Sequence, residues 1–485
     1  MNEINSQRNL TMMTDLYQLT MMYGYYRCGM DKNEAVFDMF FRQRDNSAYA
    51  IMAGTESVVD YINGLHFAKE DIDYLRSLNL FDEGFLKLLA DMRFTGEIYA
   101  MPEGTVVFPY EPLIRVKAPI MQAQLVETAI LNLVNHQTLI ATKAARVVYA
   151  AQGGVMEFGL RRAQGPDAGI YGARAAMIGG CTGTSNVLTG QMCGVPVSGT
   201  HAHSWVMSFP SEIEAFRAYA DIFPDSCMLL VDTYDTLRSG VPNAIKVFNE
   251  LRAKGHKPIG IRLDSGDLAY LSKRARIMLD DAGYPEAKIC ASGDLDESVI
   301  RDLKAQGARI DLWGVGTKLI TSMDFPALGG VYKLAAEIVD GRIVPKIKLS
   351  ENVAKMTNPG YKKVYRFYSN TTGMALADLI ALEGEKFDFS KPLTVYHPEQ
   401  RYKSKTLYDY NVRELLTPLF IDGKQVYECP NMGDIQKYAK AELATFWEES
   451  KRLMNPHVYK VDLSDELYAL KHELIEGLRN VEKAE

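Results

Sequence analysis

Six short segments combine charged or histidine side chains with glycine or threonine, in patterns suited to binding phosphate, sugar hydroxyls or a flat ring: EFGLRRAQGPDAG, GTHAH, VDTYDT, GIRLDSGD, ASGDLDE and WGVGTKL. The first places Phe158, Arg161 and Arg162 where an apolar run ends. Paired arginines can contact phosphate or carboxylate through two parallel hydrogen bonds, and a phenylalanine can stack on an aromatic ligand. A surface ion pair beside a core phenylalanine would give the same pattern, and charge alone favours that simpler interpretation.

The segment GTHAH holds two histidines, His201 and His203, which would share one face of a strand and could hold a metal ion. A barrel amidohydrolase would use such a pair, together with further histidines at later strand ends. After His203 the sequence offers only His256, in a KGHKP turn, and three histidines beyond residue 339. A catalytic metal held by this pair is therefore disfavoured.

Two segments carry aspartates whose role depends on their surroundings. Asp264 and Asp267 could be paired glycosidase carboxylates, but their spacing also fits a strand end followed by a helix N-cap. Arg262 beside them favours a site for phosphate and sugar hydroxyls. Asp294 in ASGDLDE, viewed alone, is most simply a helix cap.

The glycine-rich WGVGTKL, residues 313–319, could cradle a phosphate with exposed backbone N–H groups. It does not match GxxxxGK[ST], and no GxGxxG follows an expected strand. Neither a standard P-loop nor a Rossmann cofactor site is supported.

These segments lie in a series of seven apolar or turn-like runs that alternate with helical patterns: residues 155–159, 181–185, 196–203, 228–235, 258–267, 288–294 and 310–317. Apolar strands alternating with helices predict a parallel sheet covered on both faces, and seven such units in series favour a barrel. In a βα barrel, as in an open doubly wound sheet, ligands bind beyond the carboxyl ends of the strands. Both folds would therefore gather the polar segments at one edge.

The flanking regions predict different architecture. Short β-type runs alternate with helical patterns over residues 35–118, which indicates an α+β domain, and the helix-forming residues after Pro119, up to Ala151, predict one long helix or a helical pair. From about residue 331 β-type runs return and would complete the first domain, before helical patterns close the chain. We expect an N-terminal α+β domain at 1–125 completed by about 340–430, an α/β barrel at 126–339 and a C-terminal helical segment at 431–485.

Length and composition exclude several classes of protein. A chain of 485 residues is expected to hold two or three domains, and a formal net charge of −7 argues against coating nucleic acid or anionic membrane. Six cysteines without a CxxC pair fit a reducing compartment, and the N-terminus lacks the pattern of a secretory signal. The uncharged stretch 175–200 is too rich in glycine and polar residues for a membrane span. We expect a cytoplasmic protein with small-molecule substrates and without nucleic-acid or membrane partners.

Taken together and in order, TDLYQLTM, EFGLRRAQGPDAG, GTSN, GTHAHSWVMSF, VDTYDT, GIRLDSGD, ASGDLDE and WGVGTKLITS resemble the nicotinate phosphoribosyltransferases. KLSENVAKMTNPGYKKVYR and NPHVYKVDLS resemble that family too, so the likeness covers nearly the whole chain. The resemblance implies a type II phosphoribosyltransferase fold with an irregular α/β barrel of about seven strands. It also implies that nicotinate and 5-phosphoribosyl 1-diphosphate give nicotinate mononucleotide and diphosphate, with hydrolysis of ATP, in NAD salvage.

The resemblance further implies the roles of individual residues. His203 would be the phosphorylated histidine and Asp232 the carboxylate that orients it, in a homodimer with shared sites. Mg²⁺ would bind with the diphosphate, without direct protein ligands or through water to an aspartate. By the resemblance, Tyr17 of the second subunit and Phe158 would enclose the pyridine, and Arg161, Thr200 and Arg262 would surround nicotinate and the anionic co-substrate. Asp264 and Asp294 would contact the ribose or metal-bound water. The N–H groups of Gly316, Thr317 and Lys318 would bind the 5′-phosphate.

Two alternatives remain open. Relatives that use nicotinamide tend to carry Asp where this chain has Ser185 in GTSN, and such an acid would repel the nicotinate carboxylate, so nicotinate is preferred. A non-catalytic, metabolite-binding relative is the other alternative. The intact His203, Arg262 and Asp264 argue against it.

Overall fold

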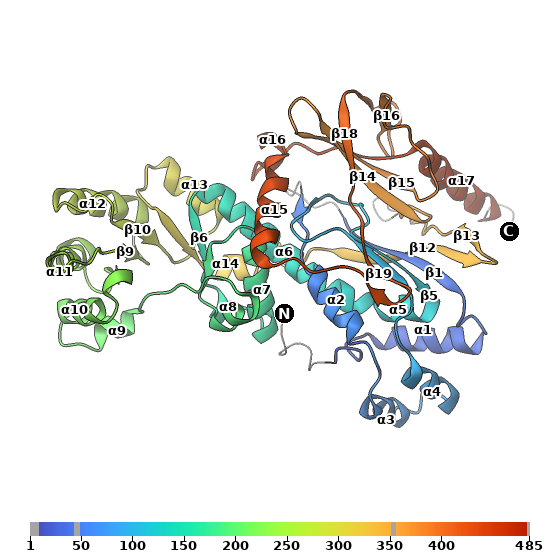
Figure 1. Ribbon diagram of the computed structural model, residues 1–485, viewed down its shortest axis with the longest axis horizontal. Helices are drawn as coiled ribbons and strands as arrows, with labels where there is room; N and C mark the ends of the chain where they lie inside the picture. The colour runs from blue at the N-terminus through green and yellow to red at the C-terminus, as the bar shows by residue number, and fades with distance from the viewer. Residues whose placement is uncertain (1–8, 43–48, 351–355, 483–485) are drawn as a thin grey trace. The chain divides into compact units, whose positions relative to one another are not determined.

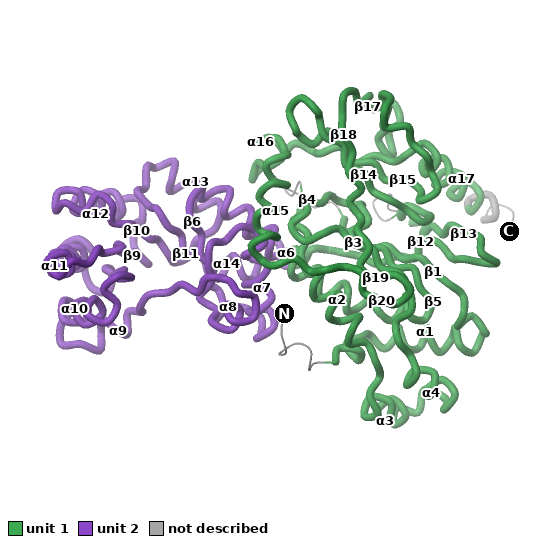
Figure 2. The backbone as a smooth tube through the Cα atoms, viewed as in Figure 1, with its two compact units in different colours: residues 1–139, 327–485 green, residues 140–326 purple. Residues whose placement is uncertain are grey.

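The computed structural model describes residues 9–42, 49–350 and 356–482 (Figure 1). The chain divides into two compact units: unit 1 combines residues 1–139 with 327–485, and unit 2 consists of residues 140–326 (Figure 2). Helix α6 (Glu127–Ala151) begins in unit 1 and ends in unit 2. Unit 2 is shorter at both ends than the barrel domain expected at 126–339, and the segment 431–485 groups with unit 1. Residues 351–355, inside the motif at 348–366, lie outside the described residues.

Unit 2 is built on a parallel sheet whose strands come from six of the seven expected runs. The sheet order is β7-β6-β11-β10-β9-β8, and every neighbouring pair is parallel. The strands are β6 (Gly154–Glu157), β7 (Gly183–Thr184), β8 (Met228–Leu230), β9 (Gly260–Leu263), β10 (Lys288–Ala291) and β11 (Leu312–Val315). Their carboxyl ends therefore meet at one edge of the sheet, as expected for a ligand site.

The seventh run, residues 196–203, is not a strand. It makes one isolated parallel bridge, between Val197 and Thr184, with the hydrogen bonds Thr184 N to Pro196 O at 3.1 Å and Ser198 N to Thr184 O at 2.9 Å. Pro196 cannot donate a hydrogen bond to a neighbouring strand, and the serine and glycine that follow Val197 weaken β structure. The expected closed barrel is thus not shown. What the structure shows is a mixed α/β fold with a six-stranded parallel sheet.

Helices cover the sheet of unit 2 and make its core. Phe216 of α10, Phe248 of α11 and Leu279 of α12 are completely buried in one cluster with Ile261 of β9 and Ile289 of β10. The helices of unit 2 after α6 are α7 (Pro166–Ile178), α8 (Val187–Cys193), α9 (His203–Met207), α10 (Glu212–Ile222), α11 (Val241–Ala253), α12 (Leu268–Asp281), α13 (Glu297–Ala305) and α14 (Thr317–Ile320). This apolar cluster fixes β8, β9 and β10 relative to one another, and with them the loops at their carboxyl ends.

Helix caps settle two of the aspartate alternatives. The Asp267 side chain accepts the N–H of Tyr270 and caps α12, which is the capping role weighed for it against a glycosidase role. Helix α13 is capped by Asp296, whose side chain accepts the N–H of Val299 at 2.7 Å. The capping role considered for Asp294 is therefore wrong, because α13 begins two residues later than that role requires. Asp294 is exposed.

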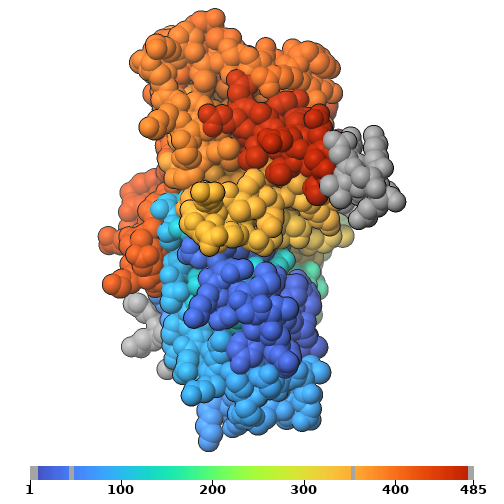
Figure 3. Space-filling view, turned by 90° about the vertical axis from the view of Figure 1, so that its right-hand side faces the viewer, coloured from blue at the N-terminus to red at the C-terminus, as the bar shows by residue number. Residues whose placement is uncertain are grey.

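Unit 1 contains a seven-stranded sheet that joins both ends of the chain. Its order is β13-β12-β1-β5-β3-β19-β20. The returning strands β12 and β19 pair antiparallel with β1 and β3, so strands from both ends of the chain share one sheet. The strands are β1 (Glu34–Phe41), β3 (Glu97–Ala100), β5 (Ile114–Pro119), β12 (Gly330–Val339), β13 (Arg342–Pro345), β19 (Thr417–Ile421) and β20 (Lys424–Gln425). From the side, gold strands β12 and β13 lie between the blue N-terminal segments and the orange C-terminal strands (Figure 3).

The sequence after Pro119 predicted one long helix or a helical pair, and the structure has the pair, α5 (Ile120–Leu125) and α6. A small antiparallel pair, β2 (Ala50–Ile51) and β4 (Val106–Val107), also belongs to unit 1. The other helices of the N-terminal region are α1 (Leu16–Arg27), α2 (Thr55–Asn63), α3 (Lys69–Ser77) and α4 (Glu83–Asp91). Within the described ranges, no helix combines the length and apolar character needed to cross a membrane.

A second sheet of unit 1 has the order β17-β16-β21-β15-β14-β18. Its strands are β14 (Lys362–Ser369), β15 (Ala375–Leu382), β16 (Leu393–Tyr396), β17 (Ser404–Leu407), β18 (Tyr410–Glu414) and β21 (Val461–Leu463). The C-terminal helices are α15 (Met432–Ala444), α16 (Glu448–Lys451) and α17 (Asp465–Glu482). The expected C-terminal helical segment thus also contributes β21, which is buried in this sheet between β15 and β16.

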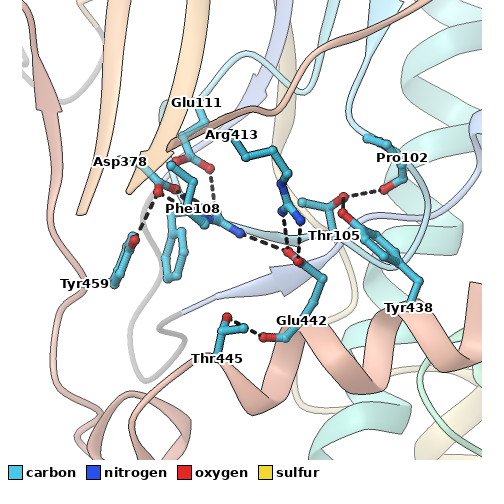
Figure 4. A network of polar contacts seen from close by, with 11 residues as sticks. Pro102, Thr105, Phe108, Glu111, Asp378, Arg413, Tyr438, Glu442, Thr445 and Tyr459 are labelled. Carbon is cyan, nitrogen blue, oxygen red and sulfur yellow. Dashed lines mark hydrogen bonds and ion pairs between the residues drawn. The ribbon is translucent and has the colours of Figure 1, made fainter. Parts of the chain in front are cut away.

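A buried ionic network ties this second sheet to neighbouring segments (Figure 4). Arg366 of β14 is fully buried and donates to Asp378 of β15, and its third nitrogen donates to Glu442 of α15 at 3.2 Å. Arg413 of β18 donates two hydrogen bonds to the same Glu442, at 2.8 and 2.9 Å. The hydroxyl of Tyr459 donates to Asp378 at 2.9 Å. Charges buried in this way are tolerated because each has an opposite partner.

Candidate functional site

A guanidinium group links two of the segments singled out in the sequence. Arg262 of β9 donates to the hydroxyl of Thr200 at 2.6 Å and to the backbone oxygen of His201 at 2.9 Å. Its Nε is buried and has no hydrogen-bond partner among the described residues. The loop before α9 is thereby attached to the carboxyl end of β9.

His203 begins α9 beside the ends of β8 and β9. Its Nδ1 lies 3.0 Å from the hydroxyl of Thr233, and its Nε2 lies 3.8 Å from a carboxylate oxygen of Asp264. The imidazole and the Asp264 side chain are 38% and 39% exposed, so both can be reached by a ligand. If Nδ1 carries the proton and donates to Thr233, Nε2 keeps a free lone pair, which is the form a nucleophilic imidazole needs.

Asp232 does not bond the imidazole, contrary to the sequence-based expectation. Its Oδ2 accepts the backbone N–H of Asp264 at 2.8 Å and the hydroxyl of Ser265 at 2.7 Å, and its Oδ1 is buried without a hydrogen-bond partner in the described part of the chain. The carboxylate faces the loop after β9 because that loop offers two donors. Asp232 therefore holds the backbone of Asp264 in place by a hydrogen bond, and Thr233 is the residue that contacts His203.

The ends of β9 and β10 are joined through Asp264. The hydroxyl of Ser292 donates to Asp264 Oδ1, while Oδ2 faces His203. Gly293 follows with a φ of +114°, and a Cβ there would lie 2.7 Å from the backbone oxygen of Asp264. Only glycine permits this close approach of the two loops. Asp294, the next residue, is exposed and can reach a ligand.

Phe158 follows β6 and lies across the neighbouring strand β11. Its backbone N–H donates to Val315 O at 2.8 Å, and a Cβ on Gly314 would come within 2.6 Å of the aromatic ring. A side chain at 314 would therefore displace the ring. Phe158 is partly exposed, as a residue that stacks on a ligand must be.

The buried carboxylate of Glu157 holds the ends of β6 and β7 together. It accepts the N–H of Gly159 and the hydroxyl of Thr184, the latter at 2.7 Å, while its backbone oxygen accepts the N–H of Ser185 at 3.0 Å. Burial raises the pKa of Glu157, and both side-chain hydrogen bonds oppose that change. Glu157 thus positions both Phe158, expected to stack on the pyridine, and Ser185, expected near the nicotinate carboxylate.

The remaining expected residues of unit 2 lie in a short turn after β6 and at the start of α14. Arg161 is exposed in the turn Leu160–Arg162. Gly316 precedes α14, with Thr317 as its first residue. Lys318 donates to Asp296 at 2.6 Å, and this hydrogen bond raises the pKa of Lys318.

Tyr17 lies on α1, in unit 1, and is 49% exposed. The other expected site residues belong to unit 2. The role of Tyr17 stays a prediction.

Sequence reasoning missed Thr233, Ser292 and Glu157 as site residues. The first two stand within two positions of a charged residue singled out in the sequence: Thr233 follows Asp232 directly, and Ser292 stands two residues before Asp294. A hydroxyl is common in turns and has no charge pattern of its own, so only its partner reveals the role. Glu157 gave no local signal of a role in the site, because in the sequence it is simply the end of an apolar strand.

A basic cluster in unit 1 was also missed. Burial lowers the pKa of Lys333, and the nearby positive charges of Lys348 and Arg42 lower it further, while Glu127 opposes them. The Nε of Arg42 is buried and lacks a hydrogen-bond partner among the described residues. The three residues are far apart in the sequence, so no local pattern marked them.

Comparison with known proteins identifies the family. The N-terminal domain of nicotinate phosphoribosyltransferase matches residues 12–135, the nicotinate phosphoribosyltransferase family matches 154–345 and its C-terminal domain matches 361–471. A nicotinate phosphoribosyltransferase of Bacillus subtilis is 48% identical over 474 residues, covering 97% of this chain and 96% of its own. One from Caenorhabditis elegans is 36% identical and covers 97% of this chain and 94% of its own. The crystal structure of human nicotinic acid phosphoribosyltransferase matches with a TM-score of 0.83 at 32% identity, covering 95% of this chain and 99% of that one. This chain belongs to the nicotinate phosphoribosyltransferase family.

Proposed function

We propose that this protein, in the cytoplasm, joins nicotinate to 5-phosphoribosyl 1-diphosphate, giving nicotinate mononucleotide and diphosphate, with ATP hydrolysed through a phosphohistidine. The transfer activity follows from membership of the family. The observation that carries the assignment of the site is the linked group of His203, Arg262 and Asp264 at the carboxyl ends of β8 and β9. By the same resemblance, residues 196–203 would be the seventh element of an irregular barrel.

The transfer needs no general base, because the pyridine nitrogen has a free lone pair. That nitrogen forms a bond to C1 of the ribose while the bond from C1 to the diphosphate oxygen breaks, and the ribosyl centre becomes cationic in the transition state. Catalysis is then mainly the stabilisation of separating charges. The carboxylates of Asp264 and Asp294 would face the ribose, and Arg262 the anionic groups.

Mg²⁺ would neutralise charge on the departing diphosphate. Within the described ranges, no three or more His, Cys, Asp and Glu side chains are grouped to hold a metal ion. Mg²⁺ is commonly held by one or two carboxylates and substrate phosphates. The partly exposed Asp264 and the exposed Asp294 fit that mode, directly or through water.

Substrate choice is the first test. With purified protein, the ribosyl donor and Mg²⁺, nicotinate and nicotinamide should compete, with nicotinate preferred and its product stimulated by ATP. Ser185→Asp is the matched variant: the added negative charge should raise the KM for nicotinate about tenfold without a similar effect on the ribosyl donor. Equal or better use of nicotinamide by the parent protein would contradict acid selectivity, and failure to form either mononucleotide would favour a non-catalytic relative.

The phosphorylated residue is the second test. Incubation with γ-labelled ATP should give an acid-labile label that is lost in His203→Ala and kept in His201→Gln. His203→Ala should also lose ATP stimulation while slow transfer persists, because the pyridine needs no base. A label that persists in His203→Ala and disappears in His201→Gln would reverse the assignment.

The shared site of a homodimer is the third test. Tyr17→Ala and Arg262→Ala are each expected to impair activity. If Tyr17 completes the site of the second subunit, mixed dimers of the two variants contain one intact site and regain part of the parent activity. No recovery despite demonstrated subunit exchange would exclude sharing through Tyr17.

A further inference from the structure

β7 and β8 are the two edge strands of the sheet of unit 2, and residues 195–203 contact both of them. On the β7 side, the backbone around Val197 pairs with Thr184. On the β8 side, the Leu230 N–H donates to a side chain, His201 Nε2, at 3.3 Å. The next amide, Val231 N–H, donates to Arg262 O of β9. Because successive strand amides point to opposite sides, the Leu230 amide is the one that points away from β9.

The imidazole of His201 is buried and held in a defined direction. Its side chain is 8% exposed and lies edge-on to Tyr219, with ring centroids 4.7 Å apart, near Phe216 at 6.3 Å. Burial lowers the pKa of His201 to about 4, so the ring is neutral at pH 7. A neutral imidazole that accepts at Nε2 carries its proton on Nδ1.

The backbone of the same residue holds Arg262. The His201 carbonyl oxygen accepts one guanidinium nitrogen, and the hydroxyl of the preceding Thr200 accepts another. His203, two residues later, starts α9 and meets Thr233 and Asp264. The side chain of His201 points to the edge of β8 while its backbone faces Arg262, so one residue connects the two strands.

We propose that His201 is a positioning residue, which occupies the free backbone N–H of Leu230 and thereby fixes the direction of the Arg262 guanidinium. The inference rests on the proposed role of Arg262 in binding substrate. The same contacts argue against a metal ion shared by the HxH pair, because His201 Nε2 accepts the Leu230 N–H while the nitrogens of His203 face Thr233 and Asp264. His201 itself touches no reacting atom in this scheme.

The full-length protein offers a matched pair of variants. In His201→Gln, the amide oxygen can reach about the position of Nε2 and accept the Leu230 N–H, whereas His201→Leu has similar bulk and no acceptor. His201→Asn provides a second loss variant, because its oxygen is too close to the backbone to reach Leu230. Arg262→Lys shows which Michaelis constant depends on the guanidinium.

The expected result is a selective one. The KM that rises in Arg262→Lys should also rise in His201→Leu and His201→Asn, by about fivefold or more, with the KM of the other substrate unchanged within about twofold. His201→Gln should restore both constants to within about threefold of the parent. The double variant Arg262→Lys/His201→Leu should be no worse than Arg262→Lys alone, because both act through the same contact.

Hydrogen exchange supplies a readout that does not depend on activity. The Leu230 amide should exchange faster in the Leu and Asn variants and remain protected in the Gln variant. A uniform fall in kcat with both KM values unchanged, independent effects in the double variant, or equal losses in Gln and Leu would each overturn the proposal. Activity of the parent protein tests the function itself, so failure of the function and failure of the positioning role are distinguishable.

Discussion

Replacing Arg366 with methionine should destabilise unit 1 by an amount that follows from its buried contacts. The guanidinium is inaccessible to solvent and binds Asp378 through two nitrogens, at 2.9 and 2.6 Å. Its second partner, Glu442, retains two hydrogen bonds from Arg413, so the charge left without a cation is that of Asp378 (Figure 4). Removing one member of a buried ion pair costs about 3–5 kcal/mol.

Hydrogen exchange followed by mass spectrometry can measure this loss within the folded protein. A loss of about 3–5 kcal/mol corresponds to roughly 10²- to 10⁴-fold faster exchange of the most protected amides of β14 and β15. The amides of β9 and β10 should change little, because the contacts of Arg366 lie within unit 1. These strands serve as an internal control.

A double variant separates charge from packing. Asp378→Asn keeps an acceptor for the Tyr459 hydroxyl and removes the charge that Arg366→Met leaves uncompensated. The double variant Arg366→Met/Asp378→Asn should therefore be more stable than Arg366→Met alone. If the two losses add, the destabilisation comes from lost packing and the electrostatic reasoning is refuted.

Three further predictions use other parts of the structure. Burial raises the pKa of Glu111 well above its ordinary value of 4.5, so the stability that its neutral form contributes is present below pH 4.5 and is lost as pH rises through the folded pKa. Glu111→Gln should flatten the fall in melting temperature that accompanies a rise of pH above 4.5, and an unchanged pH profile would contradict this. Thr233→Val should slow phosphorylation of His203 about two- to tenfold, the worth of one hydrogen bond, in rapid-quench assays, while Thr233→Ser keeps the rate; equal loss in both would exclude the hydroxyl. Gly240→Ala should destabilise by about 1–3 kcal/mol or more in thermal unfolding, because its Cβ would lie 1.8 Å from the backbone oxygen of Val231, and an unchanged melting temperature would show that the contact relaxes freely.

The sequence was sufficient where local patterns determine the outcome. Six of the seven runs became parallel strands, and the meeting of Asp232 and Asp264 at one edge followed from the rule that parallel strands end together. His203 belongs to the seventh run, which is not a strand, and reaches that edge beside Thr233 and Asp264. The helical pair at 120–151 followed from its composition. The ordered family motifs predicted the family, which the comparisons confirm.

Only the tertiary structure decided which side chains meet. Thr233, rather than Asp232, contacts His203 across 30 residues of sequence, and His201 reaches Leu230 across 29. Residues 196–203 looked like a strand because their composition starts as one, but a strand needs successive backbone pairs with a neighbour, and one bridge is all they make with β7. Periodicity and spacing report the direction of a side chain relative to its own backbone. Its partner depends on the distance between segments far apart in the chain, which is set by packing of the whole unit.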